Sequence, residues 1–422
     1  MSLPIQRTKR LLSFSKQNSA NIGQTSMHNS MNFTKSSKNL ITDIKEIYET
    51  NFNMYQNVLN NELNSNMNRK IPEEPERILD APQLIDDYYL NLLDWGNQNI
   101  LSVCLGDSVY LWNASTGHTS LLTKSENNEN ICSVNFMNNG SCLAVGLNNG
   151  YTELWDIERS TKIRNLNGHE SRVSALAWNN YILSTGSKDS LIMNHDVRIK
   201  EHIIHKFHQG HTKEVCSIKW DLENNMLASG GNDNVVCIWD VKSKSSHSTN
   251  SIWNLIEHSN ELSCTPITPM YILNQHEAAV KALAWNPWKR GVLASGGGKK
   301  DHSIKFWNTE NGTLINSYDT GSQVCQLIWN KYEKELISSH GYSKNQISIW
   351  SYPKMNKVVD LVGHMNRVLY LTMSPDGCTL VSGSSDETLR FWNINDKEKI
   401  KEYNQTGDID KLNDFFSYIN IR

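Results

Sequence analysis

An apolar segment closed by a tryptophan recurs along this chain at a spacing of roughly 40–44 residues. Six copies keep the tryptophan, which Asp, Asn or Ser follows: Trp112, Trp155, Trp239, Trp307, Trp350 and Trp392. A seventh copy, Ile-Met-Asn-His-Asp, has His195 in the tryptophan position. A period of this length is typical of propeller blades, each of which is a four-stranded sheet. The sequence therefore predicts an all-β fold, a seven-bladed WD-repeat β-propeller.

Five repeats also open on a valine that leads an alternating apolar strand: Val173, Val215, Val280, Val324 and Val368. Period-two alternation between turns rich in Gly and Asp is typical of short antiparallel strands. We place the propeller at residues 69–394, with a polar insertion at 241–272, where one spacing is longer. A segment near 78–90 should complete the last blade, because an open ring would expose edge strands.

The two ends of the chain differ from the repeats in composition. Residues 1–68 are rich in Asn, Ser and Lys, so we expect a mostly disordered tail there. Apolar residues at steps of three or four within it predict an amphipathic helix at 40–63. This helix either folds back onto the propeller or docks into a groove of a partner. Residues 395–422 form a second tail at the C-terminus.

Composition and charge exclude several classes of ligand. The formal net charge of −3 argues against non-specific nucleic-acid binding, which needs a basic surface. No apolar run approaches the ~20 residues that span a membrane, and the N-terminus lacks the apolar core of a secretory signal. The 8 cysteines include no Cys-x-x-Cys pair, so we interpret them as reduced thiols in an intracellular protein. We therefore expect no metal or other cofactor, no nucleic acid and no membrane as a ligand.

A histidine, a serine and an aspartate precede the tryptophan in several repeats. The clearest sets are His211, Ser229, Asp233 and Trp239, and then His364, Ser382, Asp386 and Trp392. These residue types can form a hydrolase triad, but catalytic groups do not occur once per blade. We interpret each set as a hydrogen-bonded network that fixes a turn of its blade. The chain is accordingly not expected to be an enzyme.

The residues directly before the opening valines differ from one blade to the next. They are Arg172, Glu214, Ala279, Gln323 and Arg367. Repeat geometry places them around the mouth of a central channel on one face of the ring. Side chains that differ from blade to blade, most of which can form hydrogen bonds, suit the binding of a short polar peptide. An ordinary solvated surface is the alternative interpretation.

Several stretches resemble one family more closely than generic repeats would: residues 77–82, 86–95, 229–234, 279–285, 322–325, 340–350 and 367–377. From about residue 69 to the end, the chain resembles the Fizzy and Fizzy-related family of co-activators of the anaphase-promoting complex. Both branches of the family fit the sequence. The resemblance implies recruitment of degron-bearing substrates such as cyclins to this ubiquitin ligase, in control of the cell cycle and chromosome segregation. It also implies spindle-checkpoint proteins as partners and a location in nucleus and cytoplasm.

The resemblance further implies a pocket for a Lys-Glu-Asn degron at the channel mouth. The matching positions are Asp94, Asn232, Asn234, Gln323 and Arg367. A carboxylate suits the peptide Lys, while amides and an arginine suit the Glu and Asn groups. Lys299 stands where the family usually has a small hydroxyl residue.

A second degron site and a docking tail are also implied by the resemblance. Asp87 and Glu387 match the acidic residues expected to bind the Arg of an Arg-x-x-Leu destruction box. From the residues alone, Asp86, Asp87 and Glu387 would equally fit a solvated acidic edge. The terminal Ile421 and Arg422 match the tail that docks on a tetratricopeptide-repeat subunit of the ligase.

The N-terminal region departs from the family pattern. Residues 1–68 contain no Asp-Arg-Phe/Tyr-Ile-Pro box, which in the family contacts and activates the ligase. A degron-binding adaptor or inhibitor that does not activate the ligase is therefore one alternative, and a generic WD-repeat scaffold is another. Thr265 and Thr268 each precede a proline and are either phosphorylation sites or parts of turns.

Overall fold

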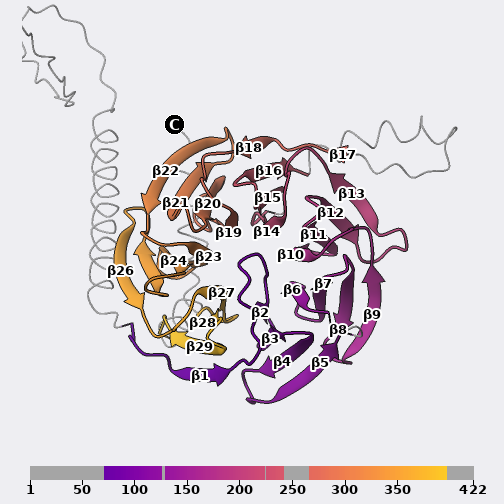
Figure 1. Cartoon of the computed structure of the whole chain (residues 1–422), viewed down its shortest axis with the longest axis horizontal. Coiled ribbons are helices and arrows are strands. Elements are labelled where there is room, and N and C mark those ends of the chain that lie inside the picture. The colour runs from indigo at the N-terminus through magenta and orange to yellow at the C-terminus, as the bar shows by residue number, and fades with distance from the viewer. Residues whose placement is uncertain (1–70, 126–128, 224, 242–265, 397–422) are drawn as a thin grey trace, which may run out of the picture. The chain divides into compact units, whose positions relative to one another are not determined.

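Seven β-sheets make up the part of the chain that the structure describes (Figure 1). The computed structural model describes residues 71–125, 129–223, 225–241 and 266–396, all within the compact unit Ile71–Arg422. Figure 1 shows the sheets arranged as blades around a common axis. None of these described residues lies in a helix. The predicted seven-bladed β-propeller is confirmed.

The first three blades follow one another along the chain, with antiparallel neighbours in each sheet. Blade 1 contains β2 (Leu93–Gly96), β3 (Ile100–Leu105), β4 (Ser108–Asn113) and β5 (Thr119–Lys124). Blade 2 contains β6 (Ile131–Phe136), β7 (Cys142–Leu147), β8 (Thr152–Asp156) and β9 (Thr161–Leu166). Blade 3 contains β10 (Val173–Asn179), β11 (Ile182–Ser187), β12 (Ile192–Asp196) and β13 (Ile203–Phe207). A fifth strand of blade 3, β17 (Pro266–Ile267), pairs in parallel with β13.

The next three blades repeat this plan. Blade 4 contains β14 (Val215–Trp220), β15 (Met226–Gly231), β16 (Val236–Asp240) and β18 (Tyr271–Leu273). Blade 5 contains β19 (Val280–Trp285), β20 (Val292–Gly297), β21 (Ser303–Asn308) and β22 (Thr313–Asp319). Blade 6 contains β23 (Val324–Asn330), β24 (Glu335–His340), β25 (Ile347–Ser351) and β26 (Asn356–Leu361).

Blade 7 closes the ring with strands from both ends of the propeller. It contains β27 (Val368–Met373), β28 (Thr379–Ser384), β29 (Thr388–Asn393) and, on its outer side, β1 (Arg77–Asp80). The antiparallel pairing places Arg77 opposite Phe391 and Asp80 opposite Thr388. The expected completion of the last blade by an early segment is thus confirmed, although only residues 78–80 of the predicted 78–90 region pair there, together with Arg77.

Hydrogen bonds within blades 4, 5 and 7 explain why the recurring polar residues are needed. In blade 4 the indole of Trp239 donates to Ser229 Oγ at 2.8 Å, and His211 Nε2 lies 2.8 Å from the same oxygen. The other ring nitrogen of His211 donates to the carboxylate of Asp233 at 3.1 Å. These side chains therefore form a scaffold, as predicted, because each polar group has its partner inside the blade.

Blade 3 replaces the tryptophan of this network by a histidine. His195 Nε2 lies 2.9 Å from Thr185 Oγ1, and its Nδ1 lies 2.9 Å from Nδ1 of His202. Burial, reinforced by the neighbouring His169 and His202, lowers the pKa of His195 well below its usual range. A chain of neutral imidazoles thus substitutes for the indole in this blade.

The predicted insertion at 241–272 extends too far. Residues 242–265 lie outside the described residues, but 266–267 and 271–273 are strands of blades 3 and 4. Main-chain pairing with β13 and β16 places these two short segments, which contain Pro266, Ile267, Tyr271, Ile272 and Leu273, in the ring. The predicted tail at 1–68, with its helix at 40–63, also lies outside the described residues, as does the C-terminal tail beyond 396.

The segment between β1 and β2 reaches the centre of the ring, where Figure 1 shows it as a loop surrounded by the inner strands. We call residues 84–92 the axial segment. Leu84, Tyr88, Leu90 and Leu92 are buried. Tyr88 Oη donates to the main-chain oxygen of Val324 at 3.0 Å. The axis of the ring is therefore packed with side chains.

Candidate functional site

Two consecutive carboxylates of the axial segment, Asp86 and Asp87, each bind one arginine of the surrounding blades. Arg172 directly precedes β10, and Arg367 directly precedes β27. Both arginines lie where an inner strand begins, as repeat geometry predicts. We use the name rim site for these four residues together with Tyr89, Glu214, Asn232 and Gln323.

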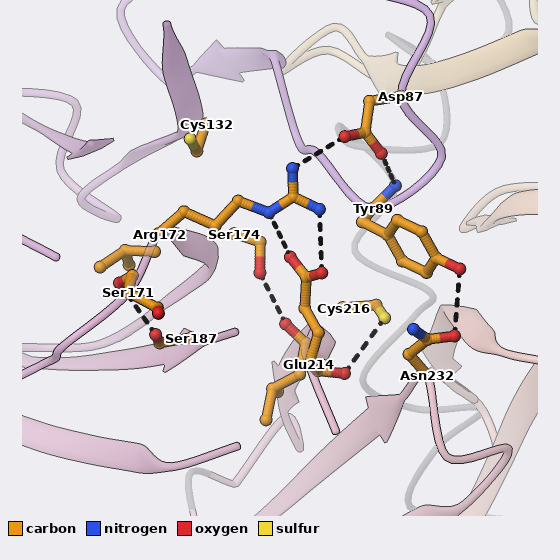
Figure 2. Close-up of polar contacts among 12 residues, drawn as sticks. Asp87, Tyr89, Cys132, Ser171, Arg172, Ser174, Ser187, Glu214, Cys216 and Asn232 are labelled. Atoms are coloured by element: carbon orange, nitrogen blue, oxygen red, sulfur yellow. Dashed lines mark hydrogen bonds and ion pairs between the residues drawn. The ribbon is translucent and has the colours of Figure 1, made fainter. Parts of the chain in front are cut away.

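Arg172 binds two carboxylates at once, as Figure 2 shows. Its Nη1 donates to Asp87 Oδ2 at 2.8 Å, while Nε and Nη2 donate to the two oxygens of Glu214 at 2.7 and 2.9 Å. The Glu214 side chain is only 5% exposed. Burial alone would lower the pKa of Arg172, but the hydrogen bonds and charges of Glu214 and Asp87 raise it above its usual value. The guanidinium is therefore a permanent cation fixed between two blades and the axial segment.

The same contacts orient Asp87 and Tyr89. The main-chain nitrogen of Tyr89 donates to Asp87 Oδ1 at 2.9 Å. Tyr89 Oη donates to the amide oxygen of Asn232 at 3.0 Å (Figure 2), and Arg172 lies 5.9 Å from the centroid of the tyrosine ring. Within the described residues the Asn232 Nδ2 group donates to no acceptor. This nitrogen is thus available to a ligand at the rim.

Arg367 binds Asp86 in a simpler arrangement. Its Nε and Nη2 both donate to Asp86 Oδ1, at 3.1 and 2.6 Å. The two side chains are 18% and 44% exposed, respectively. Gly341 lies between Arg367 and Gln323: an added Cβ there would be 3.0 Å from Gln323 Oε1 and 3.4 Å from Arg367 Cδ. The amide of Gln323 and the guanidinium of Arg367 therefore line the same part of the rim.

Asp94, which the sequence predicts as a degron-binding residue, binds partners in the neighbouring blade, and its role in degron binding stays a prediction. Its Oδ2 accepts hydrogen bonds from the nitrogen of Phe136 at 2.7 Å and from Asn135 Nδ2 at 3.0 Å. Phe136 ends β6, whereas the rim lies where the inner strands begin. Burial raises the pKa of Asp94, against the lowering effect of these hydrogen bonds. The carboxylate joins blade 1 to blade 2.

Asn234 lies near the rim site in the turn between β15 and β16. Its φ is +68°, and its nitrogen donates to the oxygen of Gly231 at 3.2 Å. Asparagine tolerates this left-handed conformation better than most residues. Asn232 and Asn234 are thus brought to one turn, as the sequence indicates.

Glu387 and Asp87, predicted as a pair, bind different partners. Glu387 Oε1 accepts a hydrogen bond from the nitrogen of Gln83 at 3.0 Å, and its main-chain oxygen accepts one from Ala81 at 2.7 Å. In the pairing of β1 with β29, Asp80 lies opposite Thr388, the residue after Glu387. Asp87 binds Arg172 at the rim. The joint role of Asp87 and Glu387 in binding a destruction box stays a prediction.

The remaining predictions concern tails and ligands. Ile421 and Arg422 lie outside the described residues, and so does Thr265. Seven cysteines of the described ranges are free and buried. No helix in the described ranges is long and apolar enough to cross a membrane. Among the same residues, no group of three or more His, Cys, Asp or Glu side chains could bind a metal ion.

Seven blades, a repeated His–Ser–Asp–Trp network and a charged rim define a WD-repeat β-propeller. Residues 79–392 match the family described as the CDC20/Fizzy WD40 domain. The chain belongs to this family, so the resemblance noted in the sequence is confirmed.

Named relatives come from both branches of the family. An Arabidopsis thaliana protein named cell division cycle 20.1, cofactor of APC complex, is 52% identical over 77% of this chain and 68% of its own. The Dictyostelium discoideum anaphase-promoting complex subunit cdc20 is 48% identical over 78% of this chain and 62% of its own. Arabidopsis thaliana FIZZY-RELATED 3 is 46% identical over 77% of this chain and 63% of its own.

A solved structure gives the same result for the fold. One chain of a crystal structure of the mitotic checkpoint complex superposes with a TM-score of 0.70. It is 45% identical in sequence, and the match covers 78% of this chain and 94% of that chain.

Proposed function

We propose that this protein is a substrate-recruiting co-activator of the anaphase-promoting complex, which binds Lys-Glu-Asn and destruction-box degrons and catalyses no reaction itself. Its relatives are named as cofactors or a subunit of that complex. The fixed position of Asp87, between the guanidinium of Arg172 and the main-chain nitrogen of Tyr89, is the observation that carries the proposal. A carboxylate that is already oriented, next to an arginine and amides, suits a peptide that has one positively and one negatively charged side chain.

The rim site provides one group for each part of a Lys-Glu-Asn peptide. Asp87 would accept the ammonium of the Lys, because its carboxylate is 26% exposed and already oriented. Arg367 would bind the Glu carboxylate, since guanidinium and carboxylate match in geometry. The free Nδ2 of Asn232 and the amide of Gln323 would pair with the peptide Asn. In this proposal Asp87 replaces Asp94, and Asn234 supports the turn.

The destruction box is assigned to the edge where blade 7 meets the start of the propeller. Glu387 remains the predicted partner for the Arg of the motif, and we propose Asp80 in place of Asp87 as a second carboxylate. Asp80 ends β1 opposite Thr388, and Glu387 directly precedes β29, so both residues lie at the same end of this strand pair. Two carboxylates near one another attract an arginine more strongly than either alone. The aromatic side chains of Trp95, Trp112 and Phe391 pack together between blades 1 and 7, close to the same edge.

Partners of the whole protein follow from the family. We assign Ile421 and Arg422 to a tetratricopeptide-repeat subunit of the ligase, as the sequence resemblance implies. Spindle-checkpoint proteins are proposed as further partners, because a structural relative occurs in the mitotic checkpoint complex. Nucleus and cytoplasm are the proposed locations.

The test combines peptide binding with a ubiquitination assay. Fluorescence anisotropy would measure the affinity of the full-length protein for a labelled Lys-Glu-Asn peptide and for an Arg-x-x-Leu peptide. Purified anaphase-promoting complex would then be assayed with a degron-bearing substrate, with and without the protein. The proposal expects both peptides to bind and ubiquitination to increase, and it expects the increase to disappear without residues 421–422.

Each alternative gives a different result. Peptide binding without stimulation of the ligase would identify a degron-binding adaptor or inhibitor. The absence of both would leave a generic WD-repeat scaffold, and the co-activator proposal would then be wrong.

A further inference from the structure

The two arginines of the rim site differ in how firmly their carboxylates are bound. Arg172 makes three hydrogen bonds to two carboxylates, one of them on the buried Glu214. Arg367 reaches a single carboxylate oxygen, Asp86 Oδ1, with both of its contacting nitrogens, and its Nη2 also donates to the main-chain oxygen of Asp86 at 3.4 Å. Asp86 is also the most exposed member of either group, at 44%. An incoming anion can therefore exchange with Asp86 far more easily than with Asp87 or Glu214.

Asp86 has the chemistry of the ligand group that Arg367 would bind. Its carboxylate faces the same nitrogens that a peptide Glu would need. We propose that Asp86 is an internal competitor, which occupies Arg367 in the free protein and must be displaced when an acidic peptide residue binds. This inference rests on the proposed peptide-binding function and identifies a residue that limits the affinity of that site.

The main chain keeps this competitor in place. Tyr370 Oη donates to the oxygen of Ile85 at 3.0 Å, directly before Asp86. On the other side, Asp87 is bound by Arg172 and Tyr88 is buried. Asp86 thus stays at a high effective concentration near Arg367. Displacement requires only rotation of an exposed side chain, so the pair can open without rearrangement of the axial segment.

The size of the effect follows from the exposure of the pair. Exposed ion pairs contribute about 0.2–1 kcal/mol in typical measurements, which corresponds to at most about a fivefold change in an equilibrium constant, with a twofold change at about 0.4 kcal/mol. Removing the charge of Asp86 should therefore strengthen binding of an acidic peptide residue by about that factor. A residue that simply bound the peptide would show the opposite sign.

The experiment uses Asp86→Asn in the full-length protein and two labelled peptides, one with Lys-Glu-Asn and one with Lys-Gln-Asn. Anisotropy should show about two- to fivefold tighter binding of the Glu peptide to Asp86→Asn, with no change for the Gln peptide. Glu158→Gln, at an exposed position outside both proposed degron sites, is the matched control for the loss of one negative charge and should leave both affinities unchanged. Weaker binding, or an equal gain for both peptides, would overturn the inference.

A second measurement does not depend on any peptide. Phenylglyoxal modifies accessible arginines, and mass spectrometry can follow the reaction at Arg367. The rate at Arg367 should rise in Asp86→Asn, and an unchanged rate would contradict internal competition even if peptides bind. If the rate rises and no peptide binds to either protein, the competitor is established and the degron function is the part that fails.

Discussion

The ammonium group of Lys281 lies 4.7 Å from the ring centroid of Tyr370, at the axis of the propeller. Lys281 Nζ also donates to the main-chain oxygen of Leu369 at 3.1 Å, and the ring of Tyr88 lies 5.8 Å away. The side chain of Lys281 is buried, and burial lowers its pKa to about 8 in spite of the nearby Cys325, Cys216 and Asp87. The centre of the ring thus contains a cation whose charge can be lost at mildly alkaline pH.

This lysine predicts how stability depends on pH. The pKa of a free lysine side chain is 10.5, so between pH 8 and 10.5 the unfolded chain binds more protons than the folded protein. Stability should therefore rise with pH across this window, by up to about 1.4 kcal/mol per pH unit.

Urea denaturation of the wild type and of Lys281→Met at several pH values checks this prediction. Buried cysteines and tyrosines titrate in the same range, but they contribute to both proteins, so the difference between the two curves isolates Lys281. A difference that does not change between pH 8 and 10.5 would mean that Lys281 keeps an ordinary pKa.

The second prediction concerns the network of blade 4. Asp233→Ala should lower the free energy of unfolding by about 1–3 kcal/mol, because His211 and the nitrogen of Thr212 lose their acceptor inside the protein. Glu158→Ala, at an exposed position, is the control and should change stability by less than about 0.5 kcal/mol. Thermal or urea denaturation measures both. A catalytic role for these side chains would instead predict a loss of activity without a loss of stability.

The third prediction compares the loss of stability when one charge of a buried ion pair is removed with the loss when both charges are removed. Arg172→Met leaves Glu214 buried beside an apolar side chain and should destabilise the protein by about 3 kcal/mol. Arg172→Met combined with Glu214→Met removes both charges and should recover much of this loss. Denaturation of the two single variants and the double variant gives the coupling energy. If the double variant is as unstable as the sum of the single ones, the pair makes no coupled contribution.

The fourth prediction distinguishes the two proposed degron sites. Asp87→Asn should weaken binding of a Lys-Glu-Asn peptide about tenfold or more, because a charge-assisted contact contributes about 1.5–3 kcal/mol. Asp80→Asn combined with Glu387→Gln should weaken an Arg-x-x-Leu peptide and spare the other. Anisotropy with both peptides and both variants measures this crossover. If Asp87→Asn weakens the Arg-x-x-Leu peptide instead, Asp87 belongs to the destruction-box site.

The number of blades and their internal networks could be read from the chain itself. Trp239, Ser229 and His211 contact one another within a single repeat, so their spacing alone predicts the contact. His195 could be assigned to a tryptophan position in the same way, because the period fixes its place in blade 3. Patterns of this kind involve residues close together in the chain, and they recur at the period of the repeat.

The rim site depended on contacts that no local pattern specifies. Asp80, Asp86, Asp87 and Asp94 all lie within one short stretch and are equally acidic, so the sequence gives no way to rank them. The structure distinguishes them by their partners. Asp87 binds Arg172, which lies 85 residues further along the chain, and Asp86 binds Arg367, which lies 281 residues further along. Asp94 is joined instead to Asn135 and Phe136, in the neighbouring blade.

The sequence by itself determined the all-β fold, the seven repeats and the membership of the family, since these follow from residues close together in the chain. Only the tertiary structure decided which carboxylates bind the arginines of the rim, and that Asp80 lies opposite Thr388 in the strand pair that closes the ring. The physical reason is that electrostatic attraction and hydrogen bonding act over a few ångströms in space. Closure of the ring, which brings residues 77–92 against blades at the far end of the chain, creates those short distances.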